Sequence, residues 1–235
     1  MTQDIKKLYD WINDSDNIVF FGGAGVSTES GIPDFRSDTG LYSEVPEVML
    51  SHTYYESNTA EFYRFYKDKM IFPEVKPNKA HYTLAKLEKA GKLKAVITQN
   101  IDGLHQAAGS DTVLELHGSV HRNYCRKCRK FHDLDYIMNN GDPMPLCDCG
   151  GVIKPDVVLY EEPLDFSVYN KAARFIADSD LFIVSGTSLA VQPAASLVLS
   201  YTGRRLVLIN MSPTQYDSHA DMIIKGKIGE VLGGY

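Results

Sequence analysis

Two polar stretches near the middle of the chain carry residue types that could take part in catalysis. Gln99–His105, which contains amides, a carboxylate and an imidazole, directly follows the apolar run Leu93–Thr98. His117 and Gly118 directly follow a second run, Val113–Leu116. Ligands of open parallel sheets bind beyond the carboxyl ends of the strands, so these polar groups are well placed to reach a site. A lone histidine is more often structural and the chain has seven, but His117 stands at a strand end beside a glycine and is therefore a stronger candidate for a functional residue.

A glycine-rich turn, Gly22–Gly25, follows another short apolar run, Ile18–Phe21. Glycine lets the backbone turn tightly and approach a ligand, and unpaired N–H groups at a helix start after such a turn favour a pyrophosphate. The dinucleotide fingerprint is incomplete, because Thr28 stands at its third glycine and no strand-end acid follows at the usual distance. The glycines alone therefore fit an ordinary tight turn equally well. The next loop, Ser30–Arg36, favours a ligand site, because it is polar and combines an Asp, an aromatic ring and an Arg.

The four cysteines lie close together in the sequence, as Cys125-x-x-Cys128 and, eighteen residues later, Cys147-x-Cys149. This layout is typical of two zinc knuckles, although the second pair is one residue shorter than usual. Four protein thiolates leave no open position for water, so we expect one structural Zn²⁺. A redox dithiol is the weaker alternative. Nearby basic residues can offset the charge of the thiolates: Arg122, Arg126, Lys127, Arg129 and Lys130.

Composition limits the possible functions. The 235 residues carry a net charge of −6, from 24 basic and 30 acidic side chains, which argues against a nucleic-acid binder that works by phosphate neutralisation. The N-terminal residues contain no apolar leader, and no stretch approaches the ~20 apolar residues of a membrane span. We therefore expect a soluble cytoplasmic protein that binds neither nucleic acid specifically nor a membrane.

Strand-like and helix-like segments alternate along most of the chain, which predicts an α/β fold with a doubly wound parallel sheet. Residues 119–155 interrupt the pattern with polar, basic and cysteine-bearing sequence, so we interpret them as a small inserted module. The expected strands cover residues 18–21, 93–98, 113–116, 157–160, 181–184, 206–209 and 222–224. Helices are expected over residues 4–13, about 56–70, 78–91, around 172–176, about 193–201 and at the C-terminus. A further helix is expected to start after the glycine-rich turn. A loop that includes Gly40-Leu41-Tyr42 is expected to run on to about residue 52.

Taken together, the motifs Gly23-Ala24-Gly25 to Arg36, Thr98 to His105, Glu115 to Gly118, the four cysteines and Gly186-Thr187-Ser188-Leu189 resemble the sirtuin family of NAD-dependent protein deacylases. The resemblance extends over nearly the whole chain. It implies a Rossmann-like large domain from about 1–35, 75–118 and 156–235. It also implies a small domain from two insertions, a helical one at about 36–74 and the zinc module at 119–155.

The resemblance further implies that NAD and an acyl-lysine peptide meet in the cleft, where the acyl group passes to ADP-ribose. Nicotinamide and 2′-O-acyl-ADP-ribose would be released, with nicotinamide also acting as an inhibitor. His117 corresponds to the general base, Asn100 and Asp102 hold the nicotinamide ribose and carboxamide, and Phe35 covers the vacated pocket. The residues that the resemblance assigns to the cofactor are Ala24, Thr28, Phe35, Arg36, Gln99, Asn100, Ile101, Asp102, His117, Thr187, Ser188, Asn210 and Ile228. Those assigned to the peptide backbone are Val157, Val158 and Leu159, through strand addition.

Two departures from the family pattern affect substrate choice. Many members read Gly-Glu where this chain has Glu161-Glu162, which leaves the loop geometry open. Members that prefer succinyl or malonyl lysine resemble Tyr-x-x-Arg where this chain has Tyr63-x-x-Tyr66, so no arginine stands in register to pair with an acyl carboxylate. We therefore predict that acetyl or another neutral acyl group is preferred.

Other functions remain alternatives on the sequence alone. A mono-ADP-ribosyltransferase would use the same NAD site, a non-catalytic module would bind NAD without releasing nicotinamide, and a dehydrogenase is possible because a fold does not fix a function.

Overall fold

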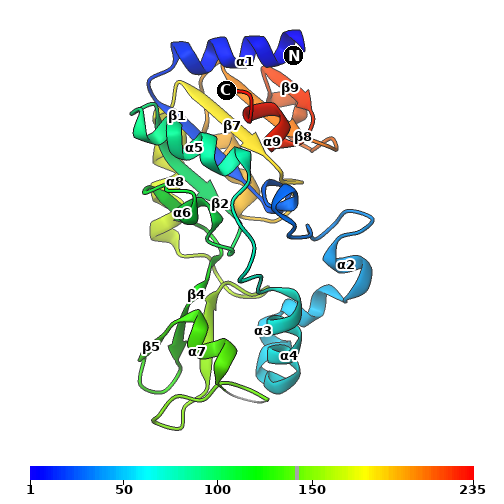
Figure 1. The fold of residues 1–235 in the computed structure, drawn as a ribbon, viewed down its shortest axis with the longest axis vertical. Coiled ribbons are helices and arrows are strands. Elements are labelled where there is room, and N and C mark those ends of the chain that lie inside the picture. The colour runs from blue at the N-terminus through cyan, green and yellow to red at the C-terminus, as the bar shows by residue number, and fades with distance from the viewer. Residues whose placement is uncertain (141–142) are drawn as a thin grey trace.

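A computed structural model describes residues 1–140 and 143–235, with the larger part of the described chain built on a six-stranded parallel sheet (Figure 1). Its strand order is β3-β2-β1-β7-β8-β9. With the six strands numbered along the chain this is 3-2-1-4-5-6, the order of dinucleotide-binding doubly wound folds. The predicted fold class is therefore confirmed. The strands are β1 (Ile18–Gly22), β2 (Leu93–Thr98), β3 (Val113–Glu115), β7 (Leu181–Ser185), β8 (Leu206–Asn210) and β9 (Met222–Lys225).

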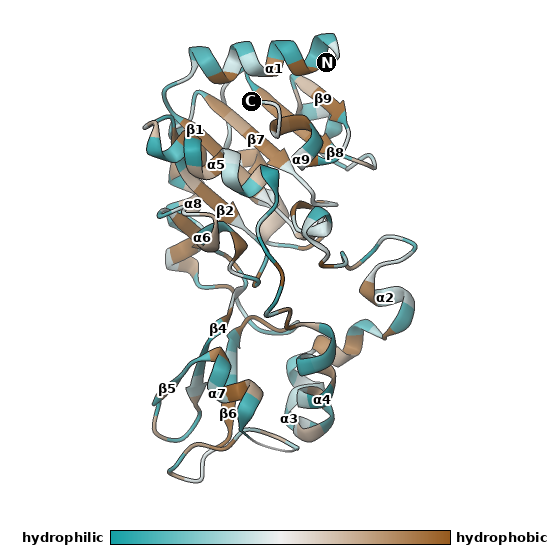
Figure 2. Cartoon of the chain, viewed as in Figure 1, coloured by the Kyte–Doolittle hydropathy of each residue, from teal (hydrophilic) through white to brown (hydrophobic). Residues whose placement is uncertain are grey.

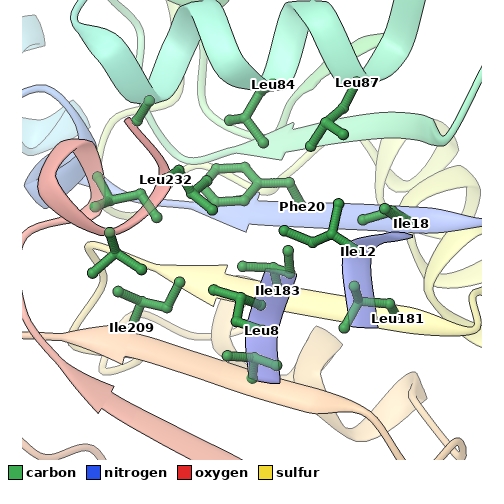
Figure 3. Packing of buried hydrophobic residues seen from close by; sticks show 14 of the residues in the cluster. Leu8, Ile12, Ile18, Phe20, Leu84, Leu87, Leu181, Ile183, Ile209 and Leu232 are labelled. Carbon is green, nitrogen blue, oxygen red and sulfur yellow. The ribbon is translucent and has the colours of Figure 1, made fainter. Parts of the chain in front are cut away.

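Alternate side chains of the central strands enter two separate cores because successive residues of a strand point to opposite faces. Ile18 and Phe20 of β1 pack under α1 (Gln3–Asp14), α5 (Lys79–Lys89) and α9 (Ile228–Leu232), as Figure 3 shows for this core. Val19 and Phe21 pack on the other face, against α8 (Phe166–Asp178) and η4 (Ala194–Ser200). Burial on both faces explains why the sequence of these strands is apolar without interruption. Figure 2 shows the same distribution, with hydrophobic strands inside and hydrophilic outer helix surfaces.

A smaller antiparallel sheet, β5-β4-β6, forms the other end of the molecule. It contains β4 (Gly118–Cys125), β5 (Phe131–His132) and β6 (Ile153–Val157). Three helices accompany it, α3 (His52–Ser57), α4 (Thr59–Lys69) and α7 (Leu134–Asn139), and bury an aromatic core that includes Tyr55, Phe62, Tyr63 and Tyr66. Gly118 has φ +76°, and a Cβ there would lie 1.8 Å from the carbonyl oxygen of Asp156, so only glycine lets β4 begin this close to β6.

Several predicted elements differ from the structure. The helix expected over 56–70 is two helices, because the backbone breaks at Asn58 (φ −136°, ψ 44°), which lets aromatic side chains of both enter one core. The strand expected at 157–160 is β6 at Ile153–Val157, and it pairs with β4 rather than entering the parallel sheet. The predicted domain boundary at 155/156 therefore passes through β6.

Short helical turns replace two expected elements. The helix predicted after the glycine-rich turn is two 3₁₀ turns, η1 (Ala24–Val26) and η2 (Thr28–Ser30), and the helix predicted at 193–201 is the 3₁₀ helix η4. The loop expected up to residue 52 contains α2 (Leu41–Glu44) and η3 (Glu47–Leu50). The remaining short elements are α6 (Leu104–Ala107) and η5 (Asp217–His219). Within the described residues, no helix combines the length and apolar character needed to cross a membrane.

Candidate active site

A cavity of about 510 Å³ lies at the carboxyl edge of the parallel strands, where the chain leaves β1, β2, β7 and β8. β1 and β7 are neighbours in the sheet, so their following loops diverge at the point where the strand order reverses, the usual ligand position in such folds. The cavity is lined by every residue predicted to bind the cofactor and by the three predicted peptide residues: Ala24, Thr28, Phe35, Arg36, Gln99, Asn100, Ile101, Asp102, His117, Val157, Val158, Leu159, Thr187, Ser188, Asn210 and Ile228.

The glycine-rich turn packs against the turn after β7, backbone to backbone. Gly25 donates its N–H to the carbonyl oxygen of Gly186 at 2.8 Å, and a Cβ on Gly25 would lie 2.7 Å from the Gly186 Cα. Gly186 has φ +62°, and its own Cβ would lie 2.4 Å from the nitrogen of Val26. This close contact explains why the turn needs glycine at both positions.

Asn100 and Asp102 are joined through Ser27, which the sequence analysis did not select. The Asn100 side-chain amide donates to Ser27 Oγ at 3.1 Å, and Ser27 Oγ donates to Asp102 Oδ2 at 2.6 Å. Burial raises the pKa of Asp102, while hydrogen bonds from Ser27 and the Leu104 N–H act in the opposite direction. The hydroxyl thereby fixes both side chains relative to each other on the floor of the cavity.

His117 is held by backbone groups on both of its sides. Its Nδ1 lies 2.9 Å from the carbonyl oxygen of Gln99, and its own carbonyl accepts the N–H of Val158 at 3.0 Å. Loss of solvent around the ring lowers the pKa of His117, and the bond to Gln99 partly opposes this effect. The imidazole is therefore neutral near pH 7 and oriented by the chain.

Polar groups from β2, β7 and β8 meet at the other end of the cavity. Gln99 donates its side-chain N–H to Thr187 Oγ1 at 3.0 Å, and the Thr187 backbone N–H donates to Asn210 Oδ1 at 3.2 Å. The buried Nδ2 of Asn210 has no hydrogen-bond partner among the described residues. A buried amide nitrogen without an acceptor is costly, so this end of the cavity is suited to a polar ligand that accepts a hydrogen bond.

The four cysteine sulfurs converge in the smaller unit, with all four Sγ atoms within 4.8 Å of one another. Cys125 and Cys149 Sγ are 3.5 Å apart, and Cys128 and Cys147 Sγ are 3.7 Å apart. Both distances are far from the ~2.05 Å of a disulfide and close to the ~3.8 Å expected between thiolates on a tetrahedral zinc with Zn–S bonds of ~2.3 Å. The donor set therefore fits the structural zinc predicted from the sequence.

The basic residues around the cysteines are engaged with other groups. Arg122 pairs with Glu115 and Asp156 at 2.6 and 2.7 Å, Arg126 pairs with Glu56 at 2.7 Å, and Lys130 pairs with Asp148. Their charges are therefore partly neutralised by carboxylates.

Comparison with known proteins identifies the family. Residues 23–193 match the model of the Sir2 family. The chain belongs to the Sir2 family. It is 60% identical to an NAD-dependent protein deacetylase of Clostridium tetani, over 97% of this chain and 96% of that protein. The family predicted from the motifs is therefore confirmed.

Solved structures of Sir2 proteins share the fold. One, with a deacetylated p53 peptide and 3′-O-acetyl ADP ribose, superposes with a TM-score of 0.92 and 39% identity, covering 98% of this chain and 96% of that one. A second, bound to a propionylated peptide, gives a TM-score of 0.88 and 39% identity over 98% and 96% of the two chains.

The peptide segment predicted from the Sir2 resemblance leaves β6 along the cavity. The Leu159 N–H donates to Glu162 Oε2 at 2.9 Å, and the Tyr160 N–H donates to the Leu50 carbonyl at 3.0 Å. The next residue, Glu161, has φ +76°, a backbone region that favours glycine. Its carboxylate accepts both the N–H and the hydroxyl of Thr53, at 2.8 and 2.6 Å, and these bonds hold the strained residue in place.

The residues used to predict acyl preference lie deeper than expected. Tyr63 and Tyr66 are fully buried in the aromatic core of the smaller unit and do not line the cavity. Apolar side chains of Met70, Phe72 and Ile101 line it instead. The sequence analysis did not select Met70 or Phe72, because their approach to the cavity depends on how α4 packs against the smaller sheet.

Proposed function

We propose that this chain removes acetyl and other neutral acyl groups from lysine side chains of proteins, consuming NAD. The observation that supports it most is the Nδ1 contact of His117 with the Gln99 carbonyl, beside Asn100 and Asp102. The match to NAD-dependent protein deacetylases over nearly the full chain supports the enzyme class. In this proposal the larger unit binds NAD and the smaller unit binds the peptide. A zinc ion would stabilise the fold of the smaller unit.

The residues fit NAD as a co-substrate. The unsatisfied amide nitrogen of Asn210 would donate to the adenosine half, and the hydrogen-bonded Asn100 and Asp102 would hold the nicotinamide ribose. When bound, NAD supplies a ribose that accepts the acyl group and nicotinamide as the leaving group. His117 Nε2 would take a proton from a ribose hydroxyl, because its Nδ1 is already committed to Gln99. Phe35 would cover the pocket that nicotinamide leaves.

We infer 2′-O-acyl-ADP-ribose as the first product. An ester can migrate between neighbouring hydroxyls, so the 3′ ester named in the related structure is compatible with this order. Val157–Leu159 would pair with an extended peptide backbone, which reads little sequence and predicts tolerance of many substrates. The apolar lining by Met70, Phe72 and Ile101 supports a neutral acyl group, because a carboxylate packed against these three side chains would lose hydration and find no partner among them.

Mass spectrometry of a reaction with NAD and an acetyl-lysine peptide tests the proposal. We expect loss of acetyl with equal amounts of nicotinamide and acyl-ADP-ribose, and we expect the reaction to stop in His117→Ala. His219→Ala, which changes an exposed histidine, is the matched control and should keep parent activity. A peptide that gains ADP-ribose and keeps its acetyl group would point to a transferase instead. A kcat/KM for succinyl-peptide equal to or above that for acetyl-peptide would contradict the acyl preference.

A further inference from the structure

Tyr160 connects two parts of the cavity wall that are distant in the sequence. Its backbone follows the proposed peptide segment and is fixed to the 50–52 segment, since its N–H donates to the Leu50 carbonyl and its carbonyl accepts the His52 N–H, both at 3.0 Å. Its side chain lines the cavity together with Phe35, Arg36 and Tyr42. The ring therefore starts from a rigid backbone and reaches the loop that follows the glycine-rich turn.

The Tyr160 hydroxyl contacts two residues of that loop. It accepts a hydrogen bond from Arg36 Nη2 at 3.1 Å and lies 2.9 Å from the Tyr42 hydroxyl. The same Arg36 nitrogen contacts Glu47 Oε1 at 3.1 Å, and the guanidinium carbon lies 5.3 Å from the centre of the Tyr42 ring. Phe35 packs on that ring with 5.5 Å between centroids. One hydroxyl thus fixes a cluster that contains both Phe35 and Arg36.

The guanidinium keeps donors available in this arrangement. Arg36 uses one of its nitrogens for both Glu47 and Tyr160, and the described residues offer no hydrogen-bond partner to the other two. Its side chain remains 38% exposed and lines the cavity. This arginine is held through one nitrogen and keeps its other N–H groups free to donate. It is therefore suited to bind an anionic group, because little further side-chain entropy is lost on binding.

We propose that the Tyr160 hydroxyl is a positioning group that orders Arg36 and the loop carrying Phe35 for NAD before NAD binds. The inference rests on the proposed function, because it takes the loop to contact NAD. Because this ordering would precede NAD binding, removal of the hydroxyl should weaken NAD binding and leave the chemical step intact.

Tyr160→Phe removes only the hydroxyl, and NAD affinity by calorimetry and steady-state kinetics measure its effect. We expect the Kd and KM for NAD to rise about five- to tenfold, the upper part of the range for an ordinary hydrogen bond. We expect kcat and the KM for acetyl-peptide to stay within about twofold, as for an interaction made equally in ground and transition states. Tyr136→Phe, which removes a hydroxyl bonded to the Leu146 carbonyl outside the cavity, is the matched control and should match the parent.

A second variant separates positioning from general stability. If Tyr160 acts through Arg36, Tyr160→Phe should cause little further loss of NAD affinity in an Arg36→Ala background. Unchanged or tighter NAD binding by Tyr160→Phe, or full additivity with Arg36→Ala, overturns the inference. A parent protein that binds NAD without deacylating would contradict the proposed function, while the Kd comparison would still decide the role of Tyr160. A parent that does not bind NAD overturns both.

Discussion

The Nδ1 atom of His117 lies 2.9 Å from the carbonyl oxygen of Gln99, the residue directly before Asn100. A carbonyl oxygen can only accept a hydrogen bond, so in the neutral ring Nδ1 carries the proton and Nε2 keeps its lone pair. The proposed base and the amide proposed to hold the ribose are thus tied to one short backbone segment after β2. The basic nitrogen is set by main-chain geometry, which a side-chain substitution at position 99 would not remove.

The pH dependence of the reaction should reflect the environment of His117. Burial lowers the pKa of this imidazole from its ordinary value of about 6.5, and only the neutral form can accept a proton. We expect the acidic limb of kcat/KM to have its midpoint below 6.5, with little change between pH 7 and 8. Initial rates of nicotinamide release across pH measure this midpoint. A midpoint at or above 6.5 would contradict the assignment.

Ser27→Ala should reduce the use of NAD. The substitution leaves the Asn100 amide without its acceptor and removes a hydrogen bond that favours the charged form of Asp102, whose pKa should then rise further. We expect kcat/KM for NAD to fall about tenfold or more, as for a lost hydrogen bond to a charged group. Ser57→Ala is the control, because this exposed serine bonds to the Thr53 and Tyr54 carbonyls and the neighbouring Asn58 amide, away from the cavity. Equal kinetics of the two variants would show that the Ser27 bridge is dispensable.

Removal of zinc should unfold the smaller unit first. Four thiolates at these distances would repel one another without a cation, so the metal and the fold around Cys125 and Cys147 should be lost together. We expect one zinc per chain by elemental mass spectrometry, and a chelator should abolish activity and lower the Tm. Cys128→Ser should likewise lose zinc, activity and thermal stability, whereas Lys127→Ala should keep all three. A protein that keeps its Tm after its zinc is removed would exclude a structural role.

Acid should destabilise the fold through two buried histidines. The rings of His81 and His105 lie 4.7 Å apart, and neither nitrogen of His105 has a partner among the described residues. Burial lowers the pKa of His81 to about 4 and that of His105 to about 3. Their contribution is therefore complete above about pH 6.5, where the unfolded state is also neutral, and is lost as the pH falls toward these values.

His105→Leu removes one of these two groups without removing a hydrogen bond. We expect the free energy of unfolding to fall less steeply with acid below pH 6.5, by up to ~1.4 kcal/mol per pH unit. Denaturant titrations at several pH values measure the slope, and His219→Ala should keep the parent slope. An unchanged slope in the His105 variant would mean that the ring is hydrated or partnered in solution.

Glu161 should tolerate glycine better than alanine. Its left-handed backbone suits glycine, and alanine keeps the strain while losing both bonds to Thr53. We expect Glu161→Gly to unfold at a higher temperature than Glu161→Ala in calorimetry. The opposite order would show that backbone strain at this residue is small.

The large sheet could be predicted because its strands are buried on both faces. Runs such as Ile18–Phe21 and Leu181–Val184 are uninterrupted and end at glycine or polar residues, which locates both the strands and the loops that line the cavity. β6 was misplaced because Ile153–Val157 includes a lysine, a proline and an aspartate, while the more apolar run beginning at Val157 turns away toward the 50–52 segment.

The contacts between distant segments could not be predicted. Ser27 and Tyr160 each join loops that lie 73 to 124 residues apart, and nothing in the local sequence says which hydroxyl meets which partner. The same limit applies to Tyr66, which the family resemblance placed at the acyl pocket but whose ring is buried where α4 packs on the smaller sheet. Periodicity assigns a face, and the packing of whole units decides what that face meets.

Only Leu116 and His117 separate β3, an edge strand of the larger sheet, from β4, the central strand of the smaller sheet. A rotation of the smaller unit that bends the chain at this crossing would have the proposed base at its hinge. In such a rotation, groups far from the hinge are displaced the most, whereas groups at the hinge stay nearly in place. The two walls of the cavity could thus close on two different substrates while the proton acceptor keeps its distance from the Gln99 carbonyl.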